Sequence, residues 1–198
     1  MTQFQSQPAT KLSDPRIARG LISVVITICL AGFATQLFLV ARCRLALHRR
    51  LGQWGAWLAV IVVVVGVATI LVRSHLMYPA ATPWTSVVVF VAFDGISLVL
   101  FGLLVSLAWR NRQRPAIHGR LMTMAMLALL PPAFGRLTSY LRHDHIEIVV
   151  VGLMTATVFI FLAVDALRSH RVQPAAWVPG LFILVVNGIT YFAQIVTD

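Results

Sequence analysis

The chain has 198 residues, of which 59% are hydrophobic and 11% charged, and its mean hydropathy is +0.87. Charged residues make up about 25% of an ordinary soluble protein, so this composition excludes a typical soluble domain. The 16 basic and 6 acidic residues give a formal charge of +10. Most basic residues fall in short connections between apolar runs, which favours anionic lipid headgroups rather than nucleic acid as the partner.

Six apolar runs follow one another along the chain, each close to the ~20 residues that an α-helix needs to cross a bilayer. The sequence therefore predicts an all-α, six-span transmembrane bundle over residues 21–198, preceded by a flexible polar segment over residues 1–20. No connection is long enough for a separate folded domain. In chain order, the predicted spans are residues 21–41, 54–72, 86–109, 121–141, 146–167 and 178–196.

The basic residues also predict the orientation of the spans. The first, third and fifth connections carry most of the arginines. The positive-inside rule places these connections in the cytoplasm and both termini in the periplasm, for a protein of a bacterial inner membrane. Lys11, Arg16 and Arg19, which precede the first span, favour the opposite orientation.

A four-residue motif occurs twice, and each copy precedes an apolar run. The copies are His48–Leu51 (HRRL) and His118–Leu121 (HGRL), 70 residues apart. The same offset relates His75 to His145, so the second and fourth spans each have a histidine before and after them. This pattern indicates duplicated helical hairpins, which are common in membrane bundles.

The two histidines around each of these spans lie ~40 Å apart along a helix, which places them at the two membrane interfaces. In one interpretation they bind headgroups, water or loop carbonyls. In another, His48 meets His118 on the cytoplasmic face and His75 meets His143 or His145 outside. Facing imidazoles of this kind are typical axial ligands of haem b, or ligands of a divalent metal.

His143 and His145 flank Asp144 on a short connection, and these three side chains are a second candidate metal site. The sequence alone does not decide between haem, metal and no cofactor.

The paired His-x-Arg-Leu motifs resemble those of small bacterial multi-span membrane proteins of unknown function. The resemblance covers mainly residues 45–145. It implies no established activity, but some similar families are linked to respiratory oxidase maturation, which implies haem or copper handling. The residues that carry it are His48, Arg50, Leu51, His118, Arg120 and Leu121.

Two charges lie inside predicted spans at a similar depth from the same face, Asp94 in the third span and Arg136 in the fourth. Unpaired charges are costly in lipid, so an ion pair is expected. The alternative is that Arg136 extends alone to the interface and Asp94 is protonated. Pro131 and Pro132 predict a kink one turn before Arg136, with carbonyls that need new partners.

Asp165 lies near the cytoplasmic end of the fifth span, and Arg168 follows three residues later. This spacing on a helix predicts an ordinary surface ion pair between them.

Three functional classes remain open. The chain has no phosphate-binding loop, dinucleotide fingerprint, nucleophile elbow or zincin motif, so an enzyme is not expected. Redox, haem or metal handling through the interfacial histidines ranks first. The alternatives are a small transporter or channel-like protein with the Asp94–Arg136 site, and a structural or assembly subunit that binds other membrane proteins.

Overall fold

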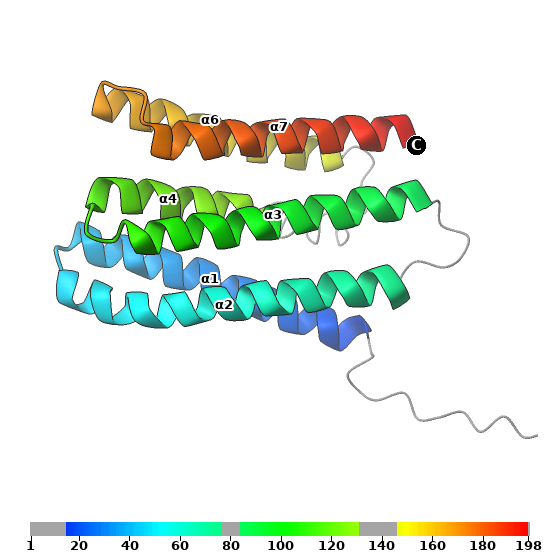
Figure 1. Ribbon diagram of the computed structural model, residues 1–198, viewed down its shortest axis with the longest axis horizontal. Helices are drawn as coiled ribbons and strands as arrows, with labels where there is room; N and C mark the ends of the chain where they lie inside the picture. The colour runs from blue at the N-terminus through cyan, green and yellow to red at the C-terminus, as the bar shows by residue number, and fades with distance from the viewer. Residues whose placement is uncertain (1–14, 77–83, 131–145, 198) are drawn as a thin grey trace, which may run out of the picture. The chain divides into compact units, whose positions relative to one another are not determined.

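The computed structural model describes residues 15–76, 84–130 and 146–197, and this part of the chain is helical without any strand (Figure 1). The predicted all-α class is therefore confirmed. The helices are α1 (Pro15–Ala41), α2 (Leu45–Leu76), α3 (Trp84–Arg110), α4 (Pro115–Ala128), α6 (Ile146–Ser169) and α7 (Pro174–Thr197).

Several of these helices have the length and apolarity of membrane spans. Within the described residues, Leu45–Val72, Val91–Arg110 and Val151–Ser169 are each long and apolar enough to cross a bilayer, and Thr27–Ala41 and Pro174–Ile189 are shorter apolar segments. A helix satisfies its own backbone hydrogen bonds, which lipid cannot do. The described residues therefore fit a helical membrane protein with three clear candidate spans, and the predicted six-span bundle is not confirmed.

Hydroxyl groups in these helices also find partners within their own helix. Thr35, Thr69 and Thr157 each donate to the carbonyl four residues earlier, at 2.8, 2.6 and 2.7 Å. Such bonds give each hydroxyl a partner within its own helix. They avoid the free-energy cost of an unpartnered polar group in hydrocarbon.

Contacts within the chain divide it into two compact units, residues 1–55 and 56–198, and the boundary falls inside α2. In the first unit, α1 ends in a Schellman turn. Cys43 adopts a left-handed backbone with φ of 53°. Its N–H donates to Val40 O at 3.0 Å, and the N–H of Arg44 donates to Leu39 O at 2.9 Å. This tight turn lets α2 begin at Leu45.

Helix ends are the main correction to the predicted boundaries. α2 begins nine residues before the predicted start at residue 54, and α4 begins at Pro115, where the fixed φ of proline suits a first helical turn. Both His-x-Arg-Leu motifs therefore lie within helices and not in connections. α1 likewise begins at Pro15, inside the segment expected to be polar and flexible. Polar residues continue these helices because their side chains reach the interface while the backbone stays helical.

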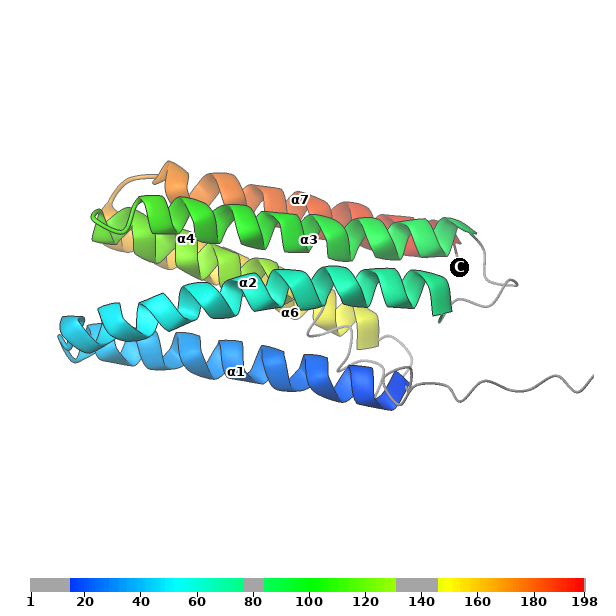
Figure 2. The ribbon, with the colours of Figure 1, turned by 60° about the horizontal axis from the view of Figure 1, so that its bottom comes forward.

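In the second unit, α3 and α4 form a hairpin, and α7 contacts α3, α4 and α6 (Figure 2). Buried side chains recur every three or four residues along α3, α4, α6 and α7, which is the stripe that a packed helix requires. The core of this unit includes Leu98, Phe101, Leu104, Ala108, Leu121, Met124, Ala125, Ala128, Met154, Val158, Leu162, Ala176 and Ile183. The exposed side chains on the outer faces are mostly apolar, as lipid contact favours.

Candidate functional site

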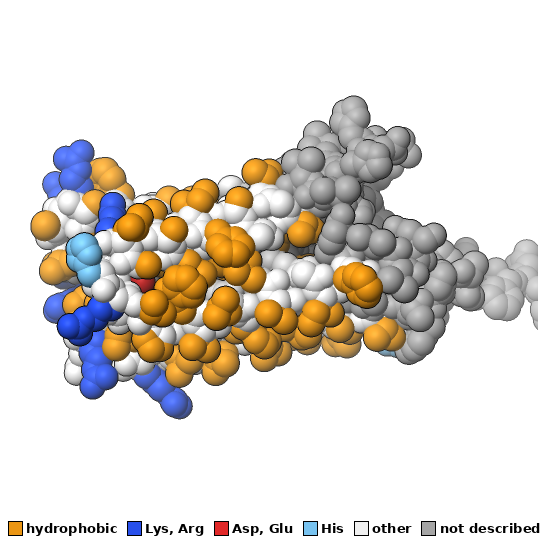
Figure 3. All heavy atoms as spheres, turned by 90° about the horizontal axis from the view of Figure 1, so that it is seen from above, with side chains coloured by type: hydrophobic (Ala, Val, Ile, Leu, Met, Phe, Trp, Pro, Cys, Tyr) orange, Lys and Arg blue, Asp and Glu red, His pale blue; other side chains and the backbone are white. Residues whose placement is uncertain are grey.

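Basic side chains gather at the end of the second unit where α3 turns into α4 and α6 into α7 (Figure 3). The exposed arginines there are Arg110, Arg112, Arg114, Arg168 and Arg171. Beneath them lie polar side chains that are partly or largely buried, and these form the candidate site. We refer to His118, Arg120, Asp165 and Trp177 as the basic-end cluster.

His118 joins α4 to the end of α3. α3 ends at Arg110, so the carbonyl of Ala108 has no donor four residues on within the helix. His118 Nδ1 lies 2.9 Å from this oxygen, and Ala108 is fully buried. A carbonyl oxygen only accepts, so Nδ1 carries the proton. In the neutral ring, Nε2 is then the basic nitrogen, which is the orientation common among metal-binding histidines.

Arg120 and Asp165 form an ion pair between α4 and α6. The Nε of Arg120 lies 2.7 Å from Asp165 Oδ1, and the two side chains are only 17% and 11% exposed. Arg120 Nη1 also donates to Ala116 O at 3.2 Å. The sequence predicted a surface pair with Arg168, but the structure pairs Asp165 with an arginine 45 residues away.

Two polar atoms of the basic-end cluster are buried without a hydrogen-bond partner among the described residues. They are Asp165 Oδ2, the second carboxylate oxygen, and Trp177 Nε1. Asn187 Nδ2, deeper in α7, is a third such atom. Buried polar groups are nearly always hydrogen-bonded in native proteins, so these atoms mark positions where a further group belongs.

His48 has a different environment in the first unit. When the Gln36 amide is assigned so that both of its polar atoms find partners, its nitrogen donates to His48 Nδ1 and to His48 O at 3.3 Å, and its oxygen accepts from Gly52 N–H at 3.0 Å. Because Nδ1 accepts here, the neutral His48 ring carries its proton on Nε2. The tautomer of His48 is therefore the reverse of that of His118.

The described residues do not test the remaining predicted ligand pairs. His75 is exposed in the last turn of α2. Gly66 of α2 packs against Leu98 of α3, so the antiparallel helices carry His75 away from Ala108 and His118. His143 and His145 lie outside the described residues, in which no group of three or more His, Cys, Asp or Glu side chains could hold a metal ion. The meeting of His48 with His118 stays a prediction.

The predicted pair of Asp94 with Arg136 is likewise untested. Asp94 is half-buried in α3, whereas Arg136, Pro131 and Pro132 lie outside the described residues.

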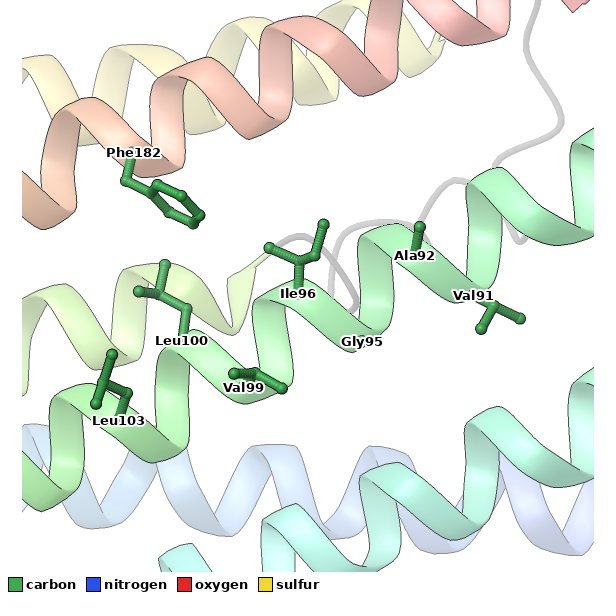
Figure 4. A pocket seen from close by; sticks show the side chains of 8 residues that line it. All are labelled: Val91, Ala92, Gly95, Ile96, Val99, Leu100, Leu103 and Phe182. Atoms are coloured by element: carbon green, nitrogen blue, oxygen red, sulfur yellow. The ribbon is translucent and has the colours of Figure 1, made fainter.

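An apolar groove of about 460 Å³ runs between α3 and α7 (Figure 4). None of its described lining residues is ionisable. The groove is lined by Val91, Ala92, Gly95, Ile96, Val99, Leu100, Leu103 and Phe182.

Sequence reasoning did not place Asp165 or Trp177 in a candidate site. The available signal was the position of Asp165 within the apolar stretch Val151–Ser169, near the C-terminal end of α6, whereas Arg120 lies near the N-terminal end of α4. An isolated intramembrane acid needs a partner from another helix.

The chain matches no protein-family model, and comparisons with curated proteins and with solved structures found no significant match.

Proposed function

We propose that the chain is a six-span protein of a bacterial inner membrane, with its arginine-rich turns in the cytoplasm and both termini in the periplasm. The three clear spans and the shorter apolar segments Thr27–Ala41 and Pro174–Ile189 support this topology. The exposed arginines at the turns of the second unit would bind anionic headgroups of the cytoplasmic leaflet.

Cys43 allows a direct test of this orientation. It is exposed in the turn between α1 and α2, whereas Cys29 is half-buried within α1. In a Cys29→Ala variant, a membrane-impermeant maleimide should label Cys43 in inverted vesicles and not in intact spheroplasts. A Cys29→Ala, Cys43→Ala variant gives the background. Labelling in spheroplasts would reverse the orientation.

We further propose that the protein is a small transporter or channel-like protein, in which Arg120 and Asp165 form the intramembrane polar site. The carrying observation is the ion pair at 2.7 Å between α4 and α6, in which the second carboxylate oxygen is buried and has no partner among the described residues. Ionisable groups within spans are expensive and typically mark ion or proton pathways. In this role Asp165 accepts the proton or cation, and Arg120 holds the carboxylate in place.

Proteoliposomes with an internal pH-sensitive dye test this proposal. A potassium gradient with valinomycin drives proton flux, and Asp165→Asn should abolish most of it. The matched control is Arg168→Gln, an exposed change one turn further along α6. Wild-type protein without flux, or Asp165→Asn protein with unchanged flux and an intact circular dichroism spectrum, would favour an assembly subunit instead.

A second candidate function is haem or metal handling through His118. The hydrogen bond from Nδ1 to Ala108 O supports it, because it makes Nε2 the basic nitrogen and fixes the ring plane. Bound haem would supply a one-electron redox centre. His48 fits such a role less well, since its Nδ1 already accepts from Gln36.

An absorption spectrum of the purified protein tests this second candidate. A Soret band that is lost in His118→Ala and kept in His75→Ala would support it. A colourless preparation after expression with added haem precursor would remove haem from consideration. Metal analysis of the same samples covers the metal alternative.

A further inference from the structure

The register of α6 against α7 brings Asp165 and Trp177 to the same level along the two helices. Gly180 packs on Leu162 so closely that a Cβ at residue 180 would lie 3.0 Å from both Leu162 methyl groups. The two helices are joined by residues 170–173 and run antiparallel (Figure 1). Counting three residues toward the connection from Leu162 gives Asp165 on α6, and counting three from Gly180 gives Trp177 on α7. A step of three residues also keeps the same helix face.

The two unsatisfied atoms at this level have complementary chemistry. Asp165 Oδ2 is an acceptor and Trp177 Nε1–H is a donor, and both are buried. They do not bond to each other, and neither has another partner among the described residues. Leaving a buried polar atom unsatisfied costs about 1–3 kcal/mol. A group that bonds to both atoms would remove both penalties and so stabilise this conformation.

We propose that Asp165 and Trp177 form a binding site for a hydroxyl group. The O–H of the ligand donates to Asp165 Oδ2, and its oxygen accepts from Trp177 Nε1–H. A hydroxyl is selected because one atom must both donate and accept. An anion would be repelled by the carboxylate, and a simple cation could not accept from the indole.

The surrounding contacts fix the geometry of this site. Arg120 holds Oδ1 of the carboxylate at 2.7 Å, which orients Oδ2. The Leu162–Gly180 contact lies three residues further from the connection on both helices and fixes their register. On the other side, the Ser169 hydroxyl bonds to Asp165 O at 2.6 Å and to Arg171 O at 2.7 Å, which fixes the end of α6. The hydroxyl comes from bound water or from a hydroxyl-bearing membrane solute. The site does not depend on transport activity.

Vibrational spectroscopy of Trp177 tests the proposal. A variant with the other four tryptophans, Trp54, Trp57, Trp84 and Trp109, changed to Phe leaves Trp177 as the reporter. Ultraviolet resonance Raman should then show a hydrogen-bonded indole N–H. Infrared difference spectra in H₂¹⁸O should show a shifted water O–H band if the ligand is water. Trp177→Phe should remove that band, and Trp109→Phe, an exposed change, should keep it.

The outcomes separate the sources of the hydroxyl from failure of the proposal. A hydrogen-bonded N–H without an isotope-sensitive band, which is lost on exhaustive delipidation, identifies a membrane solute. An N–H without a hydrogen bond overturns the proposal. A hydrogen-bonded N–H that shows no isotope-sensitive band in H₂¹⁸O, survives delipidation and disappears in Asp165→Leu also overturns the proposal. This result identifies a direct bond from the indole to the carboxylate. Wild type minus Trp177→Phe spectra give the same readout if the fourfold variant does not fold.

Discussion

The two copies of the His-x-Arg-Leu motif share their residues and spacing but not their surroundings. In the first copy, Arg50 is exposed and His48 accepts a hydrogen bond from Gln36. In the second copy, Arg120 is largely buried in an ion pair, and His118 donates to the end of α3. The comparison shows that the motif itself does not define a site. The neighbouring helices decide which copy carries buried charge.

The largest expected difference between the copies concerns their arginines. Arg120→Gln removes the partner of a buried carboxylate and should destabilise the protein by about 3–5 kcal/mol. Arg50→Gln, at the corresponding exposed position, should change stability by no more than about 0.5 kcal/mol. Unfolding by SDS in mixed micelles, followed by circular dichroism, measures both. Similar losses for the two variants would show that the copies are energetically equivalent.

The second prediction concerns the packing that positions the basic-end cluster. Gly180→Ala forces a methyl group against Leu162, which is 1% exposed, and should destabilise the protein by about 1–3 kcal/mol. Gly188→Ala lies on the same helix, where an added Cβ meets nothing within 4 Å, and should be neutral or slightly stabilising. The same micelle titration applies. If Gly180→Ala is as harmless as Gly188→Ala, Leu162 moves aside and does not fix the register.

The sequence was sufficient to predict the helices but not which side chains pair between them. Apolar runs predicted each described helix, because only helices satisfy the backbone in lipid. The ends were missed, since His48 and Arg50 look like loop residues although their backbone is helical. Asp165 was assigned to Arg168 because local spacing is visible in a sequence. Its actual partner, Arg120, depends on how α4 packs against α6, which a single sequence does not specify.

A third prediction concerns the tautomers of the two motif histidines. NMR of ¹⁵N-labelled histidine, at a pH where both rings are neutral, should find the proton on Nε2 in His48 and on Nδ1 in His118. Gln36→Leu should allow His48 to change tautomer and should cost about 1 kcal/mol of stability, the usual net value of one hydrogen bond. His118 should not respond to this change. Identical tautomers in the two rings would contradict the assigned donors.

The smallest expected effect lies in the turn that precedes the first motif copy. Cys43 occupies the left-handed position of the Schellman turn, with φ of 53°, where glycine is the usual residue. Cys43→Gly relieves the contact of Cβ with the backbone, but it also loosens the unfolded chain, so the net gain should be at most about 1 kcal/mol. Cys43→Ala keeps the Cβ and should give no gain, which separates backbone strain from loss of the thiol. A loss of stability in Cys43→Gly, with Cys43→Ala unchanged, would mean that the turn is not strained. The start of α2, and with it the helical position of His48, would then be fixed by other contacts, such as the one from Gln36.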